Sequence, residues 1–163
     1  MAPPFNRICS KAEDAFKAVV ELELDTNLTG VQVVVGFTGN TKLQPRRVHI
    51  ICPRATPWCI DDMIFTGNWW VDFEITAVTN YQDNTRAQRE ALAAELFDII
   101  LQKDLPEKLN NIGNVEDFHA YGSGQNQSEF GLVPAELVRD VDGDSYFEVL
   151  TGRLLCRPST GEA

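Results

Sequence analysis

This 163-residue chain contains no apolar run that approaches the roughly 20 residues needed to span a membrane. Its opening residues, MAPPFNRICS, also lack the apolar stretch of a secretion signal. Basic residues are scarce, with 14 Lys and Arg against 24 Asp and Glu, so the formal net charge is −10. A dedicated nucleic-acid binder needs a basic surface to neutralise phosphates. We therefore expect neither a membrane segment nor a nucleic-acid-binding role.

Cysteines and histidines are few, and their spacing does not suit metal or redox chemistry. The four cysteines are Cys9, Cys52, Cys59 and Cys156. No two of them have the two-residue separation of a zinc knuckle or a redox motif, so we expect free thiols in a reducing cytoplasm. His49 and His119 lie far apart without a carboxylate at ligand spacing, which indicates packed or surface residues.

One acidic motif resembles the start of a calcium-binding loop. Asp140, Asp142 and Asp144 alternate as in an EF-hand, but Ser145 stands where that loop needs Gly, and Thr151 where it needs a bidentate Glu. The Asp-Gly pair inside this stretch favours an acidic hairpin turn instead. With no other metal, nucleophile or phosphate-binding pattern, we predict no cofactor and no enzymatic activity.

The strongest pattern is architectural and lies between residues 68 and 101. From Trp69 to Thr79, apolar residues alternate with more polar ones, which is typical of a strand with one face in a core. The predicted core face carries Trp69, Val71, Phe73, Ile75 and Ala77. A helix follows, with Thr85 and Gln88 as its capping box. Its apolar arc is wider than that of a simple surface helix, so it lies deep on its own sheet or partly contacts a neighbouring subunit. The arc consists of Leu92, Ala93, Leu96, Phe97, Ile100 and Leu101.

The remaining patterns complete a single α+β domain spanning residues 1–163, with an ordered core of about 8–157. A first helix is predicted over about Ser10 to Leu24, with a capping box from Ser10 to Glu13. Further strands are predicted over 31–37, 48–52, 118–121 and 145–157, with Pro53 closing the second and 54–67 irregular. Residues 133–141 fit either a helical turn or an extended segment. Residues 122–131 have the composition of a mobile polar loop, and the C-terminal tail is expected to be flexible. These elements predict a mostly antiparallel sheet with two long helices packed on it.

Charge and aromatic residues indicate candidate interfaces. Residues 26–60 contain no Asp or Glu, so this segment carries +4 on an otherwise acidic chain. It is either a basic loop or a patch that docks on an acidic surface, possibly that of an identical neighbour. Exposed Trp residues are enriched among interface hot spots. The candidate subunit or partner interface consists of Lys42, Arg46, Arg47, Arg54, Trp58, Trp70 and Phe130.

The order of these elements resembles the tail terminator proteins of long-tailed bacteriophages, also called tail-completion or head-to-tail joining proteins. The resemblance spans roughly residues 10 to 157 and is one of pattern and order, without an invariant motif. The segments that carry it are SKAEDAFKAVVELEL, RVHIICP, WWVDFEITAVT, NTRAQREALAAELFDIIL and, after the DVDGD turn, SYFEVLTGRLLCR. The irregular stretch 54–67 and the chain length both exceed those of the smallest members.

The resemblance implies a virion structural protein that assembles in the host cytoplasm. Copies of such a subunit form a homo-oligomeric ring, expected to be a hexamer, at the head-proximal end of the tail. The ring stops tail tube polymerisation and joins the tube protein to a head-closure or neck protein, while DNA only passes through the channel. An acidic lining would let DNA pass without binding. The alternatives are another neck component of the head-closure type, or a small cytoplasmic α/β enzyme or ligand-binding domain.

Overall fold

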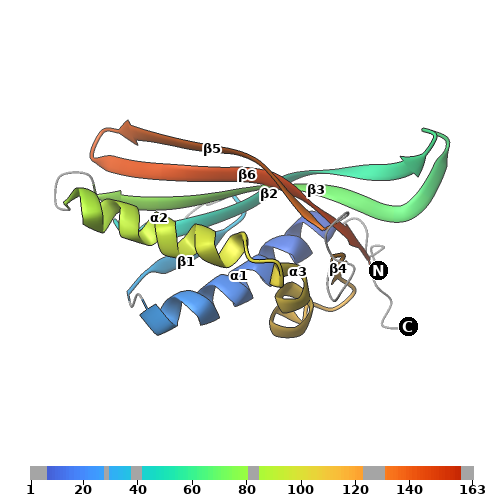
Figure 1. Ribbon diagram of the computed structural model, residues 1–163, viewed down its shortest axis with the longest axis horizontal. Helices are drawn as coiled ribbons and strands as arrows, with labels where there is room; N and C mark the ends of the chain where they lie inside the picture. Colours follow the sequence, from blue (N-terminus) through green and yellow to red (C-terminus); the bar gives the residue numbers. More distant parts are fainter. Residues whose placement is uncertain (1–6, 28–29, 38–41, 81–84, 123–130, 159–163) are drawn as a thin grey trace.

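The computed structural model describes residues 7–27, 30–37, 42–80, 85–122 and 131–158. Within these residues, three α-helices pack against one face of a six-stranded mixed sheet, and the opposite face carries no helix (Figure 1). The predicted α+β class is confirmed. The sheet is mixed because β1 pairs with β2 in parallel, whereas the other strand pairs are antiparallel.

The elements follow one another in a simple order. The helices are α1 (Ile8–Asn27), α2 (Arg86–Ile100) and α3 (Leu105–Lys108), and α3 continues into a short π-helical turn (Leu109–Gly113). The strands are β1 (Gln32–Val35), β2 (Arg47–Ile60), β3 (Ile64–Asn80), β4 (His119–Ala120), β5 (Leu132–Asp142) and β6 (Ser145–Arg157). Across the sheet the order is β1-β2-β3-β6-β4, and β5 also pairs with β6. No helix in the described ranges has both the length and the apolarity to cross a membrane.

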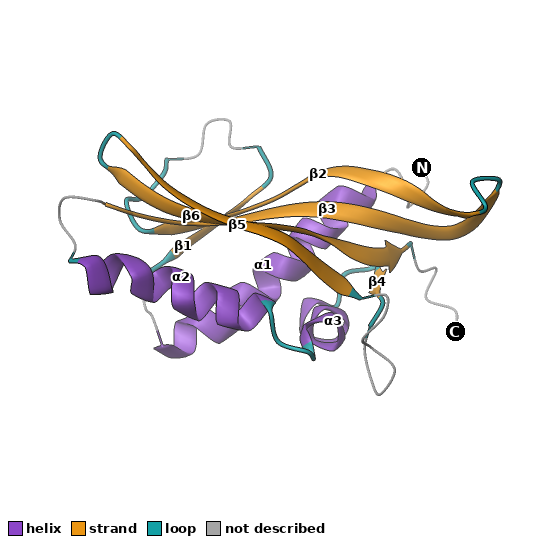
Figure 2. Ribbon diagram, turned by 45° about the horizontal axis from the view of Figure 1, so that its top comes forward, coloured by secondary structure: helices purple, strands orange, loops and turns teal. Residues whose placement is uncertain are grey.

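The core lies between the sheet and the helices, which lie on one side of the sheet in Figure 2. The alternation predicted for β3 is confirmed, since Val71, Phe73, Ile75 and Ala77 are buried on the helix side, and Trp69 is half-buried there. Phe73 meets Phe16 of α1, with the ring centroids 5.4 Å apart. This aromatic contact joins the longest strand to the first helix.

Helix α2 begins as its sequence predicts. Thr85 is the N-cap, and both hydrogen bonds of the capping box with Gln88 are present. The apolar arc of α2 is buried within the subunit itself, apart from Leu101, which is 50% exposed. Of the two interpretations of this arc, the structure therefore favours a helix sunk on its own sheet, and the arc offers no broad surface to a neighbour.

The predicted start of the first helix is wrong. Helix α1 begins at Ile8, so Ser10 lies inside it and does not form a capping box with Glu13. The Glu13 carboxylate instead accepts a 2.8 Å hydrogen bond from the backbone N–H of Cys52 in β2. Cys52 lies beyond the end of the β1–β2 pairing and at a register shift between β2 and β3. The register shift disturbs the regular pairing of β2 at Cys52, and the Glu13 side chain on α1 accepts the hydrogen bond of this backbone N–H instead.

The prediction that Pro53 ends a strand and that 54–67 is irregular is also wrong. Strand β2 continues through Pro53 and Pro57 to Ile60, and with β3 it forms one long hairpin. Proline cannot donate a ladder hydrogen bond, so it is tolerated on edges and at bulges. Both conditions hold, because β1 pairs with β2 only as far as Ile50, and register shifts occur beside both prolines.

The C-terminal part resolves the remaining ambiguity. Residues 133–141 are extended and belong to β5, which pairs with β6 across a turn at Gly143–Asp144. Gly143 is the first of the two turn residues and has a φ of 60°, a value that glycine adopts without strain in a two-residue hairpin turn. The last strand and the short strand at 119–120 lie where the sequence predicts them. Most of the predicted mobile loop, 123–130, and the tail from 159 onward lie outside the described residues.

Candidate assembly surfaces

The most prominent surface feature is the outer end of the β2–β3 hairpin, which we call the arm (residues 58–68). Strand β6 pairs with β3 only from Trp69 onward, so the arm extends beyond the rest of the sheet (Figures 1 and 2). At its tip, Asp61 and Asp62 have φ values of 53° and 58°, and the Met63 N–H donates to the Ile60 carbonyl at 3.0 Å. These are the features of a tight hairpin turn with two left-handed residues.

The arm exposes large apolar side chains. Met63 is 86% exposed and Ile64 is 63% exposed, and the other two members of the group are also more than half exposed. The group consists of Ile60, Met63, Ile64 and Phe65. Phe65 makes an edge-on contact with Trp69, with the ring centroids 5.5 Å apart, which ties the base of the arm to the sheet. Clustered exposed apolar residues indicate an interaction site, unlike single ones.

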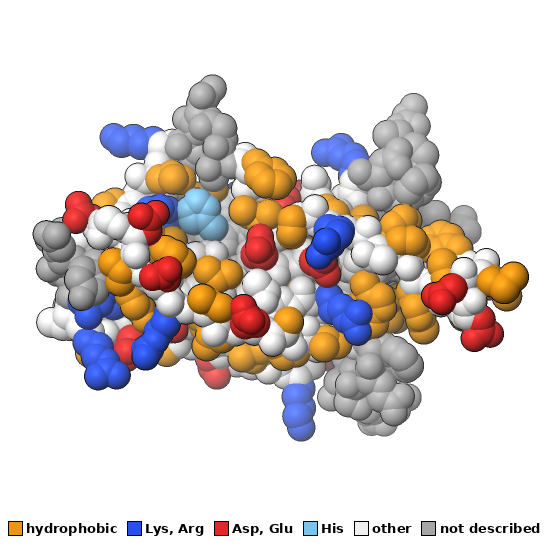
Figure 3. Space-filling view, turned by 90° about the horizontal axis from the view of Figure 1, so that it is seen from above, with side chains coloured by type: hydrophobic (Ala, Val, Ile, Leu, Met, Phe, Trp, Pro, Cys, Tyr) orange, Lys and Arg blue, Asp and Glu red, His pale blue; other side chains and the backbone are white. Residues whose placement is uncertain are grey.

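A second candidate surface is the open face of the sheet, which the helices do not cover (Figure 3). Apolar and charged side chains mix on it, and it is not a basic patch. Arg54 pairs with Asp72 at 2.7 Å, and the Arg153 guanidinium lies 4.2 Å from the centre of the Trp70 ring. The side chains of Arg54, Asp72, Glu74 and Arg153 line a hollow of about 360 Å³. Arg54 is highly exposed, so its ion pair contributes little to stability.

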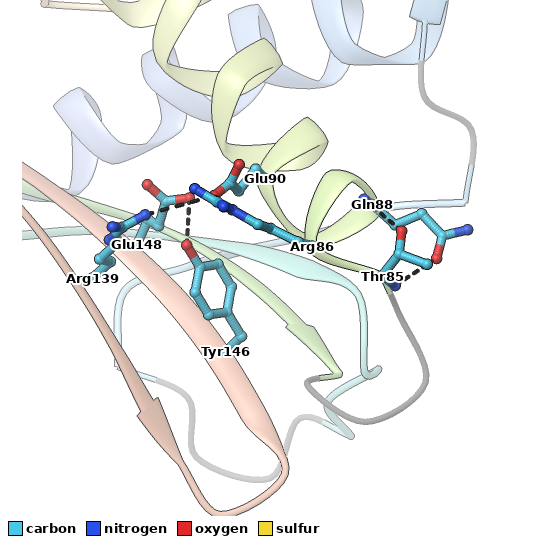
Figure 4. Close-up of polar contacts among 7 residues, drawn as sticks. All are labelled: Thr85, Arg86, Gln88, Glu90, Arg139, Tyr146 and Glu148. Atoms are coloured by element: carbon cyan, nitrogen blue, oxygen red, sulfur yellow. Dashed lines mark hydrogen bonds and ion pairs between the residues drawn. The ribbon is translucent and has the colours of Figure 1, made fainter.

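A polar cluster occupies the other end of the molecule, where the start of α2 meets the β5–β6 hairpin (Figure 4). Glu90 accepts from Arg86 at 3.1 Å and lies 3.6 Å from Arg139 of β5. The Tyr146 hydroxyl donates to Glu148 at 2.9 Å. Arg89 lies 5.7 Å from the centre of the Tyr146 ring. These contacts fasten the helix to the edge strand and frame a hollow of about 320 Å³.

The structure does not unite the predicted interface residues into one patch. Arg54 and Trp70 share the open face, and Trp58 lies on the arm. Arg47 is the first residue of β2, and Lys42 and Arg46 precede it. Phe130 lies outside the described residues.

Arg47 is partly withdrawn from solvent and tied to its own strand. It donates to the His49 ring nitrogen Nε2 at 2.7 Å, as well as to the Gln44 carbonyl. Burial, together with the positive charge of Arg47, lowers the pKa of His49, so its imidazole is neutral and accepts this hydrogen bond. Burial and nearby Arg157 also lower the pKa of His119. The two histidines lie on different strands, β2 and β4, and form no common site.

Among the four free cysteines, Cys9 and Cys156 both lie close enough to Cys52 to raise its pKa, as does Glu13. Burial, with a smaller effect of Glu13, raises the pKa of Cys9, and the same causes raise that of Cys52 well above its usual value. Burial also raises the pKa of Cys156. Protonated thiols are poor nucleophiles and poor metal ligands. Across the described ranges, no three His, Cys, Asp or Glu side chains are arranged to hold a metal ion.

No protein-family model matches this chain, and no curated protein matches it either. The candidate surfaces therefore rest on the geometry of the chain itself. The sequence did not predict the arm, because Pro53 and Pro57 indicated an irregular segment at 54–67. The available signal was the pair of aspartates flanked on both sides by apolar residues, from Ile60 to Phe65. The cluster around Arg139 left no local signal, because its members come from α2, β5 and β6.

Proposed function

We propose that this protein is a structural subunit of a bacteriophage virion that forms a ring at the head-proximal end of the tail. In this role it stops polymerisation of the tail tube and joins the tube to a head-closure or neck protein. The observation that carries the proposal is the arm, whose exposed apolar residues project beyond the subunit's own core. A projection of this kind suits insertion into another subunit better than it suits an isolated monomer.

The finer fold is part of the same proposal. The order of elements supports a tail-terminator-like architecture: a first helix, a long antiparallel hairpin, a helix crossing the sheet and a closing strand. A ring also requires two different, complementary surfaces on each subunit. The molecule offers different surfaces at the two ends of its long axis, with the arm at one end and the α2–β5 cluster at the other (Figure 1).

The charge of the chain supports passage of DNA without binding. At a net charge of −10, a ring of several copies would repel phosphates along any surface that shares this excess of acid. The tube protein and the neck protein are then the partners above and below the ring. A basic channel lining in an assembled ring would contradict this part of the proposal.

The test is electron microscopy of the purified protein mixed with tail tubes assembled from the tube protein of the same genome. We expect rings, or caps at one end of each tube, and tubes that stop growing when the protein is added. Native mass measurement of the protein alone gives the stoichiometry, for which six copies are expected. Tubes that grow to the same length with and without the protein, and that carry no caps, would refute the proposal. An unrelated acidic protein of similar size serves as the control.

The hollow on the open face favours one rival, a small ligand-binding domain or enzyme. Its rim brings Arg54, Asp72, Glu74 and Arg153 together around about 360 Å³. The rival predicts a strict monomer that ignores tubes and binds a small polar ligand. Ligand binding that is lost in Arg153→Ala, in a protein that never caps tubes, would establish the rival.

A further inference from the structure

The two ends of the molecule carry side chains that suit one another, with acids and apolar residues at one end and exposed arginines and apolar residues at the other. At one end, the arm presents Asp61 and Asp62 at its tip, with Met63 and Ile64 exposed beside them. Asn-Gly is the sequence that most easily adopts such a turn, because both central residues need positive φ. Asp tolerates this conformation better than most residues, but two adjacent aspartates repel each other, so the turn does not require both charges. Their charges are available to a partner.

At the other end lies the arginine corner, which we define as Arg86, Arg89 and Arg139 with the side chains around them. Three arginines and two acids, Glu90 and Asp140, line the hollow here, and Glu148 lies beside it, so the corner lacks the excess of acid that the whole chain carries at −10. Arg86 and Arg139 both contact Glu90, Arg139 also makes a hydrogen bond with Tyr146, and the two arginine side chains remain 79% and 64% exposed. Each guanidinium has five N–H donors, so Glu90 leaves donors on both that face solvent.

Apolar side chains adjoin these arginines. One face of β5 carries Leu137, Arg139 and Val141, because residues two apart on a strand point to the same side. Their partners on β6 are Leu150, Glu148 and Tyr146, in that order. Leu137 and Val141 are large apolar residues that stay exposed within the subunit. The corner thus combines cationic donors with an apolar strip, whereas the arm combines two acids with apolar neighbours.

We propose that the tip of the arm of one copy docks on the arginine corner of the next copy. Asp61 and Asp62 face the guanidinium groups of Arg86 and Arg139, while Met63 and Ile64 cover the apolar strip of β5. This docking rests on the proposed function in one respect: it is the contact between neighbouring copies that would close the ring. Because the two surfaces lie at opposite ends of the long axis, the contact is head-to-tail, which gives rings when the rotation closes (Figure 1).

The first test removes the acids of the arm without weakening its turn. The double variant Asp61→Asn with Asp62→Gly installs the sequence that favours this hairpin, so a loss of association cannot come from unfolding of the arm. We expect the dissociation constant between copies, measured by sedimentation velocity in low salt, to rise by roughly tenfold. The matched control is Glu21→Gln with Asp98→Asn, which removes two exposed charges elsewhere and should leave association unchanged.

The second test addresses the other partner surface and the apolar part of the contact. Arg86→Gln with Arg139→Gln should weaken association to a similar extent as the arm variant, and combining the two double variants should add little further loss. Salt should weaken the wild-type complex, because it screens exposed charges. Met63→Ser with Ile64→Thr should weaken association in high salt as well as in low salt.

The outcomes separate this docking from the tail-terminator role. A wild-type protein that stays monomeric at high concentration in low salt would overturn the docking, as would arm and corner variants that associate like the control. Rings that cap tubes equally well in all variants would leave the terminator role intact and remove the docking. Copies that associate through both surfaces but ignore tubes would keep the docking and remove the terminator role.

Discussion

The buried carboxylate of Glu13 provides the sharpest test of how the first helix is fixed to the sheet. Only 8% of this residue is exposed, and its Oε2 accepts the Cys52 N–H at 2.8 Å. We consider two substitutions, Glu13→Ala, which removes the acceptor, and Glu13→Gln, which keeps an acceptor oxygen but carries no charge. The two variants separate the hydrogen bond from the ionisation of the carboxyl group.

The hydrogen bond sets the magnitude for the alanine variant. Leaving a buried backbone N–H without an acceptor costs about 1–3 kcal/mol of unfolding free energy. For a protein of this size each kcal/mol lowers the melting temperature by about 2–4 °C, so a decrease of about 2–12 °C is expected. Glu13→Gln avoids this loss because its side-chain oxygen still accepts from Cys52.

Ionisation sets the pH dependence. Burial raises the pKa of Glu13 above its usual 4.5, with a further contribution from Asp14, while the hydrogen bond from Cys52 acts in the opposite direction. The folded state therefore holds a proton on Glu13 at pH values where the unfolded state has released it. Stability falls as pH rises from the unfolded pKa through the folded one, and the penalty persists above it. The stability of Glu13→Gln relative to wild type should increase over this interval and then level off.

Urea unfolding of all three proteins between about pH 4 and about pH 8 checks both points. Other titrating groups are common to the proteins, so they cancel in the difference between Glu13→Gln and wild type. A difference that stays constant across this range would refute the proposed effect of burial on Glu13. Equal stability of Glu13→Gln and Glu13→Ala would refute the importance of the hydrogen bond to Cys52.

Two further substitutions test the packing of β6 and β4. A Cβ at Gly152 would lie 2.6 Å from both Phe73 Cζ and the Val133 carbonyl oxygen, so Gly152→Ala should lower the free energy of unfolding by about 1–3 kcal/mol in urea titrations; unchanged stability would mean that β5 moves aside freely. Asn110 both donates to the Ala120 carbonyl at 2.9 Å and accepts from its N–H at 2.7 Å, so Asn110→Ala should cost about 2–3 kcal/mol and speed hydrogen exchange at the Ala120 amide. A hydrogen-exchange rate at the Ala120 amide equal to that of wild type would contradict the role of these two hydrogen bonds.

Local patterns in the sequence determined several elements of this fold. The period of two in β3 and the Asp-Gly turn before β6 were sufficient to place both strands, because alternation and turn chemistry are properties of neighbouring residues. The capping box at Thr85 fixed the start of α2 for the same reason. The absence of acids between residues 26 and 60 was a fact of composition. It left open whether these basic residues form a loop or a docking patch. The structure places Arg47 at the start of β2 and Arg54 farther along the same strand.

Only the tertiary structure decided the rest, because the relevant partners are distant in sequence. Pro53 can remain within β2 since β1 has already ended and leaves that edge unpaired. Glu13 became an acceptor for Cys52 because α1 crosses the sheet there, 39 residues away along the chain.

The candidate interfaces follow the same division. The arm's aspartates and apolar residues were visible in the sequence, but their projection depends on where β6 stops pairing with β3. The residues of the arginine corner come from α2, β5 and β6, so only folding brings them together. Residue types and local periodicity thus came from the sequence alone, whereas exposure, charge pairing and shape came from contacts between segments that only folding brings together.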